Sequence, residues 1–126
     1  MGGNAPRLVR ASERRFAADQ TAGMVREEAM HTAGIWAGVV RTEPGRFSSW
    51  HHHGAHESVI FVVSGTVRLE CGPEGKTVFH ARAGDYLYLP PGEVHREGND
   101  GGEESEIVVV RSGSGELVVN VAGPIA

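Results

Sequence analysis

Short runs of strand-forming residues, separated by glycine and proline, are the feature that most restricts the fold of this chain. The 126 residues include 18 glycines and six prolines. Between them lie segments rich in Val, Ile, Tyr and Phe, namely residues 34–41, 58–64, 66–71, 76–82, 85–89, 105–111 and 116–121. Such segments at roughly even spacing predict an all-β sandwich or barrel. A chain of this length is expected to form a single domain.

The first 34 residues lack this pattern. Residues 12–20 could form a turn or two of helix, but no apolar periodicity supports a longer one. We therefore expect an irregular N-terminal arm over residues 1–34, packed on the barrel or on a partner subunit. The β-barrel domain is expected to span residues 35–126.

The charge balance and the amino terminus narrow the range of partners. Twelve basic residues stand against 16 acidic ones, giving a net charge of −4, so no basic excess points to nucleic acid. The first ten residues hold no apolar run of signal-peptide length, and no segment is long enough to cross a bilayer. We expect a cytoplasmic protein without a nucleic-acid or membrane partner. The single cysteine, Cys71, cannot form an internal disulfide and is expected to be a small buried hydrophobe.

Four histidines and a carboxylate stand within seven residues. They are His51, His52, His53, His56 and Glu57. Imidazole and carboxylate are ligands of borderline divalent metals when they are brought close together. In an extended strand His51 and His53 project from one face and His52 from the other. His51 and His53 thus predict two ligands of a metal site, and His95 can supply a third from elsewhere in the chain.

These histidines belong to two longer spaced motifs. Residues 45–57 read Gly-x5-His-x-His-x3-Glu, and residues 84–99 read Gly-x5-Pro-x-Gly-x2-His-x3-Asn. In both motifs the chain resembles the cupins. In the first cupin motif, six residues separate the glutamate from a final glycine. The second cupin motif is matched here at every specified position. The resemblance covers roughly residues 35–121. It implies a cupin double-stranded β-helix, or jelly-roll barrel, with an irregular N-terminal arm outside it.

The resemblance also implies a metal site. Carried over residue by residue, it makes His51, His53 and His95 ligands inside the barrel, with Glu57 as the fourth. Three neutral imidazoles with one carboxylate would hold Zn, Mn, Fe, Ni or Cu, and intrinsic affinity does not decide among these ions.

The spacing after His53 leaves the fourth ligand open. Counted forward from His53, Glu57 stands at the motif position, but counted backward from Gly65 that position falls on Ser58. Either a bulge absorbs the extra residue and Glu57 coordinates, or Ser58 faces inward and the site lacks that ligand. His56 is a third candidate, because some cupins use a fourth histidine. We expect Glu57.

A site with three protein ligands and open positions is typical of catalysis, since substrate or water can complete the coordination shell. The first hypothesis is a small metal-dependent enzyme, of dioxygenase, isomerase or cyclase type, acting on an oxygen-rich small molecule. The alternatives are a metal-dependent binding module without turnover, and a structural barrel that the metal only stabilises. The fold does not decide among them, and the catalytic residues stay unassigned. Cupins commonly pair, so we also expect a homodimer.

Overall fold

The computed structural model describes residues 5–17, 21–113 and 118–126, and in this part of the chain the regular structure is almost entirely β-strand. The strands are β1 Arg15–Phe16, β2 Met24–His31, β3 Ile35–Thr42, β4 His51–His52, β5 Ser58–Ser64, β6 Thr66–Cys71, β7 Thr77–Arg82, β8 Tyr86–Leu89, β9 His95–Gly98, β10 Ser105–Ser112 and β11 Val119–Asn120. Two 3-10 helices, η1 Ala11–Glu13 and η2 Pro73–Gly75, accompany them. Among the described residues there is no helix with the length and apolar character needed to cross a membrane.

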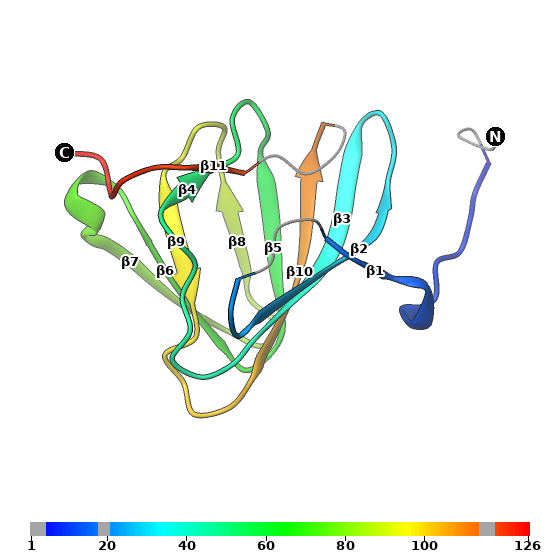
Figure 1. Cartoon of the computed structure of the whole chain (residues 1–126), viewed down its shortest axis with the longest axis horizontal. Helices are drawn as coiled ribbons and strands as arrows, with labels where there is room; N and C mark the ends of the chain where they lie inside the picture. Colours follow the sequence, from blue (N-terminus) through cyan, green and yellow to red (C-terminus); the bar gives the residue numbers. More distant parts are fainter. Residues whose placement is uncertain (1–4, 18–20, 114–117) are drawn as a thin grey trace.

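The strands form two antiparallel sheets that make the walls of one barrel (Figure 1). One sheet has the order β1-β2-β3-β10-β5-β8, and the other has the order β11-β4-β9-β6-β7. Both sheets alternate apolar residues toward the interior, as in β5, where Ile60 and Val62 are buried while Val59 and Val63 are exposed. The buried apolar core draws on both sheets and comprises Met24, Trp36, Val40, Ile60, Val62, Val67, Leu69, Ala81, Leu89, Ile107 and Val109. The expected all-β jelly-roll barrel is confirmed.

Most of the strands lie where glycine and proline delimit the apolar runs. β5 and β6 occupy the predicted residues. β7, β8 and β10 differ from them by one residue at one end, and β3 is shifted by one residue at both ends. The strand expected at residues 116–121 is the short β11, and residues 116 and 117 of that range lie outside the described part of the chain.

Residues 24–31 depart from the expected irregular arm. They form β2, which pairs with β3 from Met24 opposite Thr42 to His31 opposite Trp36. The six-stranded sheet therefore continues across residue 34, and the domain boundary expected there stays a prediction. Residues 5–13 are mostly exposed and extend beyond the sheet edge (Figure 1).

The two histidine motifs lie side by side as antiparallel neighbours. His51 of β4 stands directly opposite His95 of β9. Backbone hydrogen bonds extend this pairing, with the N–H of Ser48 donating to the carbonyl of Glu97 at 2.8 Å. Three residues before His95, Gly92 has a φ of +74°, a conformation that favours glycine. Its N–H donates to the carbonyl of Gly54 at 2.8 Å. The pairing of the motifs places their histidines on one interior face.

Candidate metal centre

Three buried histidines converge inside the barrel. His51, His53 and His95 are 3%, 7% and 0% exposed. One ring nitrogen of each lies within 4.8 Å of those of the other two. The ring centroids of His51 and His95 are 4.3 Å apart, and that of His53 is 4.9 Å and 5.2 Å from them. The three imidazoles are therefore positioned to bind one metal ion.

Backbone carbonyl groups fix the orientation of two of these rings. Nδ1 of His51 lies 2.7 Å from the carbonyl oxygen of Ser49, and Nδ1 of His95 lies 2.8 Å from that of Glu93. A carbonyl oxygen only accepts, so each Nδ1 carries the proton and each Nε2 presents a lone pair. A hydrogen bond from the distal ring nitrogen is the usual way in which a metal-binding histidine is oriented.

A carboxylate that the sequence reasoning missed lies beside these lone pairs. Glu97 Oε1 is 3.7 Å from His51 Nε2, and Glu97 Oε2 is 3.9 Å from His95 Nε2. These separations are too long for hydrogen bonds. Nε2 of His95 is buried and, among the described residues, has no hydrogen-bond partner. Because lone pairs and carboxylate oxygens are all acceptors, this donor set fits a cation among them.

The pKa shifts favour the neutral form of His51 and the ionised form of Glu97. Burial lowers the pKa of His51 below its usual value, because desolvation disfavours the imidazolium, although Glu97 opposes this effect. Burial acts to raise the pKa of Glu97, but the positive charge that His95, His51 and His53 carry when they are protonated outweighs it, so the net shift of that pKa is downward. Neutral imidazoles and ionised carboxylates are the forms that bind metals.

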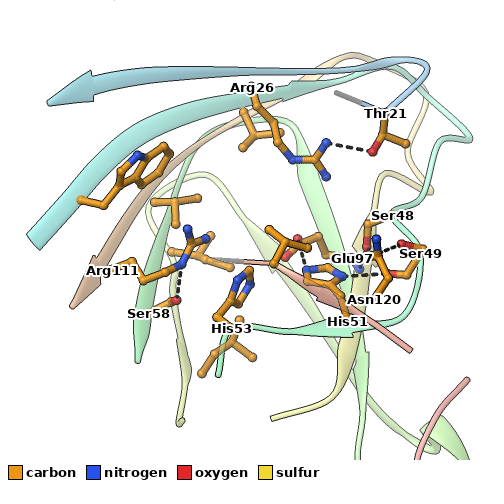
Figure 2. Close-up of a pocket in the computed structure, with 16 residues that line it drawn as sticks. Thr21, Arg26, Ser48, Ser49, His51, His53, Ser58, Glu97, Arg111 and Asn120 are labelled. Carbon is orange, nitrogen blue, oxygen red and sulfur yellow. Dashed lines mark hydrogen bonds and ion pairs between the residues drawn. The ribbon is translucent and has the colours of Figure 1, made fainter. Parts of the chain in front are cut away.

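His51 and His53 line a cavity of about 190 Å³ (Figure 2), whereas His95 is absent from its described lining. Its described lining consists of Thr21, Arg26, Trp36, Val40, Ser48, Ser49, His51, His53, Ser58, Ile60, Leu89, Glu97, Val109, Arg111, Val118 and Asn120. The apolar part of this wall is formed by Trp36, Val40, Ile60, Leu89, Val109 and Val118, and the other described lining residues are polar or charged. A small molecule could therefore reach the histidines from this cavity.

The structure does not bring the expected fourth ligand, Glu57, to the histidines. Glu57 is exposed, and its Oε1 accepts a hydrogen bond from the hydroxyl of Tyr88 at 2.8 Å. β5 begins at Ser58, and its alternation turns Ser58 into the cavity, where it is 2% exposed. Ser58 rather than Glu57 therefore occupies the inward position. The expectation that Glu57 is the fourth ligand is corrected, because its side chain lies outside the cavity.

The remaining histidines of the cluster lie apart from the group. His52 turns away, as expected, and its Nδ1 accepts a hydrogen bond from the N–H of Gly54 at 2.9 Å. His56 is half-buried and is absent from the described lining of the cavity. The sequence signal that could have found Glu97 is its position two residues after His95, since alternate residues of a strand share a face.

Comparisons with known proteins agree with this architecture. The sequence model of the family described as "Cupin domain" matches residues 38–111. No curated protein matches the chain significantly. Solved structures with the same fold include a conserved protein with a double-stranded β-helix domain from Klebsiella pneumoniae, with 23% identity, 94% of this chain and 99% of that chain covered, and a TM-score of 0.75.

Two further structures are KdgF from Halomonas sp. and a mutant of oxalate decarboxylase from Bacillus subtilis. KdgF is 21% identical, with 88% of this chain and 96% of that chain covered and a TM-score of 0.75. The oxalate decarboxylase is 21% identical, with a TM-score of 0.73, and 82% of this chain covers 29% of that longer chain. At these identities the likeness shows the fold alone. Because the family match spans more than half of the sequence, this chain belongs to the cupin family.

Proposed function

We propose that this cupin is a metal-dependent enzyme acting on a small, oxygen-rich molecule. The observation that carries the proposal is the convergence of three buried imidazoles, two of which, His51 and His53, line a cavity. Backbone carbonyls orient the Nε2 lone pairs of His51 and His95. Protein ligands that leave positions open to a cavity are typical of catalytic metal sites. The Mn(II) centres named for the oxalate decarboxylase of Bacillus subtilis support a metal within this fold.

His51, His53 and His95 would hold the ion, and we propose Glu97 in place of Glu57 as the carboxylate of the set. A bound Zn, Mn, Fe, Ni or Cu ion would supply Lewis acidity toward an oxygen of the substrate. The chain's own residues do the positioning. The carbonyl groups of Ser49 and Glu93 keep the imidazoles in the metal-binding tautomer, and the apolar wall limits the water that can compete with a substrate.

Matched carboxylate variants test this site. Wild-type protein, purified without a histidine tag, should hold one metal ion per chain by elemental analysis. Glu97→Gln should weaken the affinity at least about tenfold in a chelator competition, because the amide offers a poorer donor. Glu57→Gln, at an exposed position away from the three histidines, should bind like wild type. The reverse pattern would restore Glu57 as the ligand, and metal-free wild type after supplementation would refute the site.

Turnover separates the enzyme from a binding module. Metal-loaded protein is incubated with a panel of small oxygen-rich acids, with and without dioxygen, and the mixtures are followed by proton NMR and oxygen uptake. Consumption that disappears in His51→Ala supports an enzyme. A compound that raises the melting temperature and is not consumed indicates the binding module instead.

A homodimer is a further proposal, supported by apolar side chains on the outer face of the six-stranded sheet. Val59, Tyr86, Tyr88 and Val110 are exposed. Val59 stands opposite Tyr88 and Val110 in the register of the sheet, so these side chains are neighbours. Contiguous exposed apolar surface marks interaction sites. Size-exclusion chromatography with light scattering should give twice the chain mass of 13.4 kDa, and a monomer would refute the dimer.

A further inference from the structure

We propose that the N-terminal arm of each chain, residues 5–13, lies across the outer face of the six-stranded sheet of a second copy. The inference goes beyond the proposed homodimer and rests on it, because it assigns the segment that covers the exposed apolar surface. Its basis is that one chain presents both an exposed apolar face and an exposed arm that extends away from that face (Figure 1).

Two rows of apolar side chains cross the outer face of this sheet. Residues that stand opposite one another in the register share a face. One row consists of Tyr88, Val59, Val110, Ala37 and Met30. The other row consists of Tyr86, Phe61, Val108, Val39, Glu27 and Phe16. We refer to the two rows, Glu27 excepted, as the outer apolar face. Tyr86, Tyr88 and Phe16 are 70%, 56% and 74% exposed, so the described part of the chain leaves much of this face uncovered.

The outer apolar face is too small to hold two copies together by itself. Neighbouring strands lie about 4.8 Å apart and alternate residues of a strand about 7 Å apart, so the two rows cover roughly 300 Å². A stable interface buries about 800 Å² of each partner. A further segment of the chain must therefore contribute to the contact between the copies.

The arm fits the outer apolar face in length and in chemistry. Residues 5–10, which precede η1, reach about 20 Å when extended. Five strands at their usual spacing span about 19 Å. Leu8 is 68% exposed and offers an apolar side chain, and Arg10 follows it at the spacing of residues on one side of an extended chain. The exposed carboxylate of Glu57, which accepts a hydrogen bond from Tyr88, lies at the β8 end of the face and is opposite in charge to Arg10.

The course of the arm directs it away from the face of its own chain. β1 pairs with β2 at the edge of the sheet, and residues 5–13 continue beyond that edge (Figure 1). Nη2 of Arg7 donates to the carbonyl of His31 at 3.2 Å, which holds the arm at the end of β2. Residues 5–13 are exposed except for Val9, which is half-buried. Ordering an extended segment costs conformational entropy, and contacts with the face of a second copy would offset that cost.

Shortening the arm tests its contribution, with the dimer dissociation constant measured by sedimentation equilibrium. Removal of residues 1–10 should raise that constant at least about a hundredfold, because each dimer loses two arms. Leu8→Ala should raise it at least about tenfold. Ile125→Ala is the matched control, since Ile125 is an apolar side chain that is 48% exposed beside η2, away from the face, and this variant should associate like wild type. Thermal melts followed by circular dichroism check that each protein is folded.

Mixing two defective chains tests whether the arm acts between copies. Val110→Glu places a charge in the middle of the outer apolar face but keeps the arm, whereas the shortened chain keeps the face. Val59→Glu replaces Val110→Glu if the latter does not fold. Native mass spectrometry of the mixture should show a heterodimer, held by one arm on one intact face, in excess of either homodimer.

The outcomes separate this inference from the homodimer itself. A shortened chain that dimerises as tightly as wild type overturns the inference and leaves a dimer held by the sheets alone. A mixture with no more heterodimer than homodimer also overturns it, because the arm would then act within its own chain. A monomeric wild type refutes the homodimer and the inference together, and the metal site is unaffected by any of these results.

Discussion

Replacing His95 by leucine should distinguish two contributions to the unfolding free energy: the destabilisation caused by the buried imidazole in the metal-free protein, and the stabilisation provided by bound metal. His95 is fully buried, and its Nε2 has no hydrogen-bond partner among the described residues. Removing such an atom gains about 1–3 kcal/mol, whereas losing the hydrogen bond from Nδ1 to Glu93 costs about 0.5–1.5 kcal/mol. Leucine has a similar volume, so little cavity is left. The metal-free variant should therefore lie within about 2 kcal/mol of wild type in unfolding free energy.

With metal present, the two proteins should diverge. A metal ion at about one hundred times its dissociation constant stabilises wild type by about 2.7 kcal/mol. In a domain of this size that corresponds to a rise in melting temperature of roughly 10 °C. The variant lacks one of three imidazoles, so its gain at the same metal concentration should be below about 1 kcal/mol.

Thermal melts followed by circular dichroism, with chelator and at two metal concentrations, measure both quantities on the same samples. His52→Leu is the matched control, because His52 turns away from the centre, and this variant should keep the full metal-dependent rise. The reasoning is refuted if His95→Leu rises with metal as wild type does. It is also refuted if the metal-free variant loses more than about 4 kcal/mol, since His95 would then serve packing rather than binding.

Two further variants test the scaffold. Arg96 and Arg68 hold the pKa of Glu70 below its usual value through hydrogen bonds to its carboxylate. Glu70→Gln should therefore cost about 1–2 kcal/mol at neutral pH. That deficit should shrink in urea unfolding below about pH 4, where wild type itself takes up the proton, and a constant deficit would contradict this. Asn99 is fully buried, with Nδ2 donating to two backbone carbonyls at 2.9 Å and 2.6 Å. Asn99→Ala should lose about 2–4 kcal/mol in the same assay with unchanged metal content, and loss of the metal would argue against a purely structural function.

The barrel could be predicted from the sequence because most of its strands obey one simple pattern. In β5 and β10 apolar residues alternate toward the core, and glycine or proline ends most of the runs. β2 escaped prediction because its alternation carries charge inward. Arg26 lines the cavity, and Glu28 accepts a hydrogen bond from the indole N–H of Trp36 at 2.8 Å. A strand whose inward side chains are polar lacks the alternation of apolar and polar residues by which strands are predicted.

The three histidines of the centre could be predicted because their spacing in the sequence matches the alternation of side chains along a strand. His51, His53 and His95 come together because two spaced segments pair as neighbouring strands. The carboxylate was not predictable in this way, because the turn between His53 and β5 decides whether Glu57 or Ser58 faces inward. A shift of one residue reverses the face, and spacing alone does not fix such a shift. Glu97 follows His95 at the spacing of residues on one strand face, but the cupin motif specifies no carboxylate at that position.

β2 and β11 also bear on how such a barrel can change its preference over evolution. The histidines lie within residues 38–111, the stretch shared with the cupin family, whereas Arg26 and Asn120 reach the same cavity from outside it. Part of the cavity wall is thus encoded outside the stretch that carries the histidines. Mutations in β2 or β11 can therefore alter part of the cavity wall while the three histidines stay in place. Exchanging β2 between two cupins would consequently change one side of the cavity without touching the histidines.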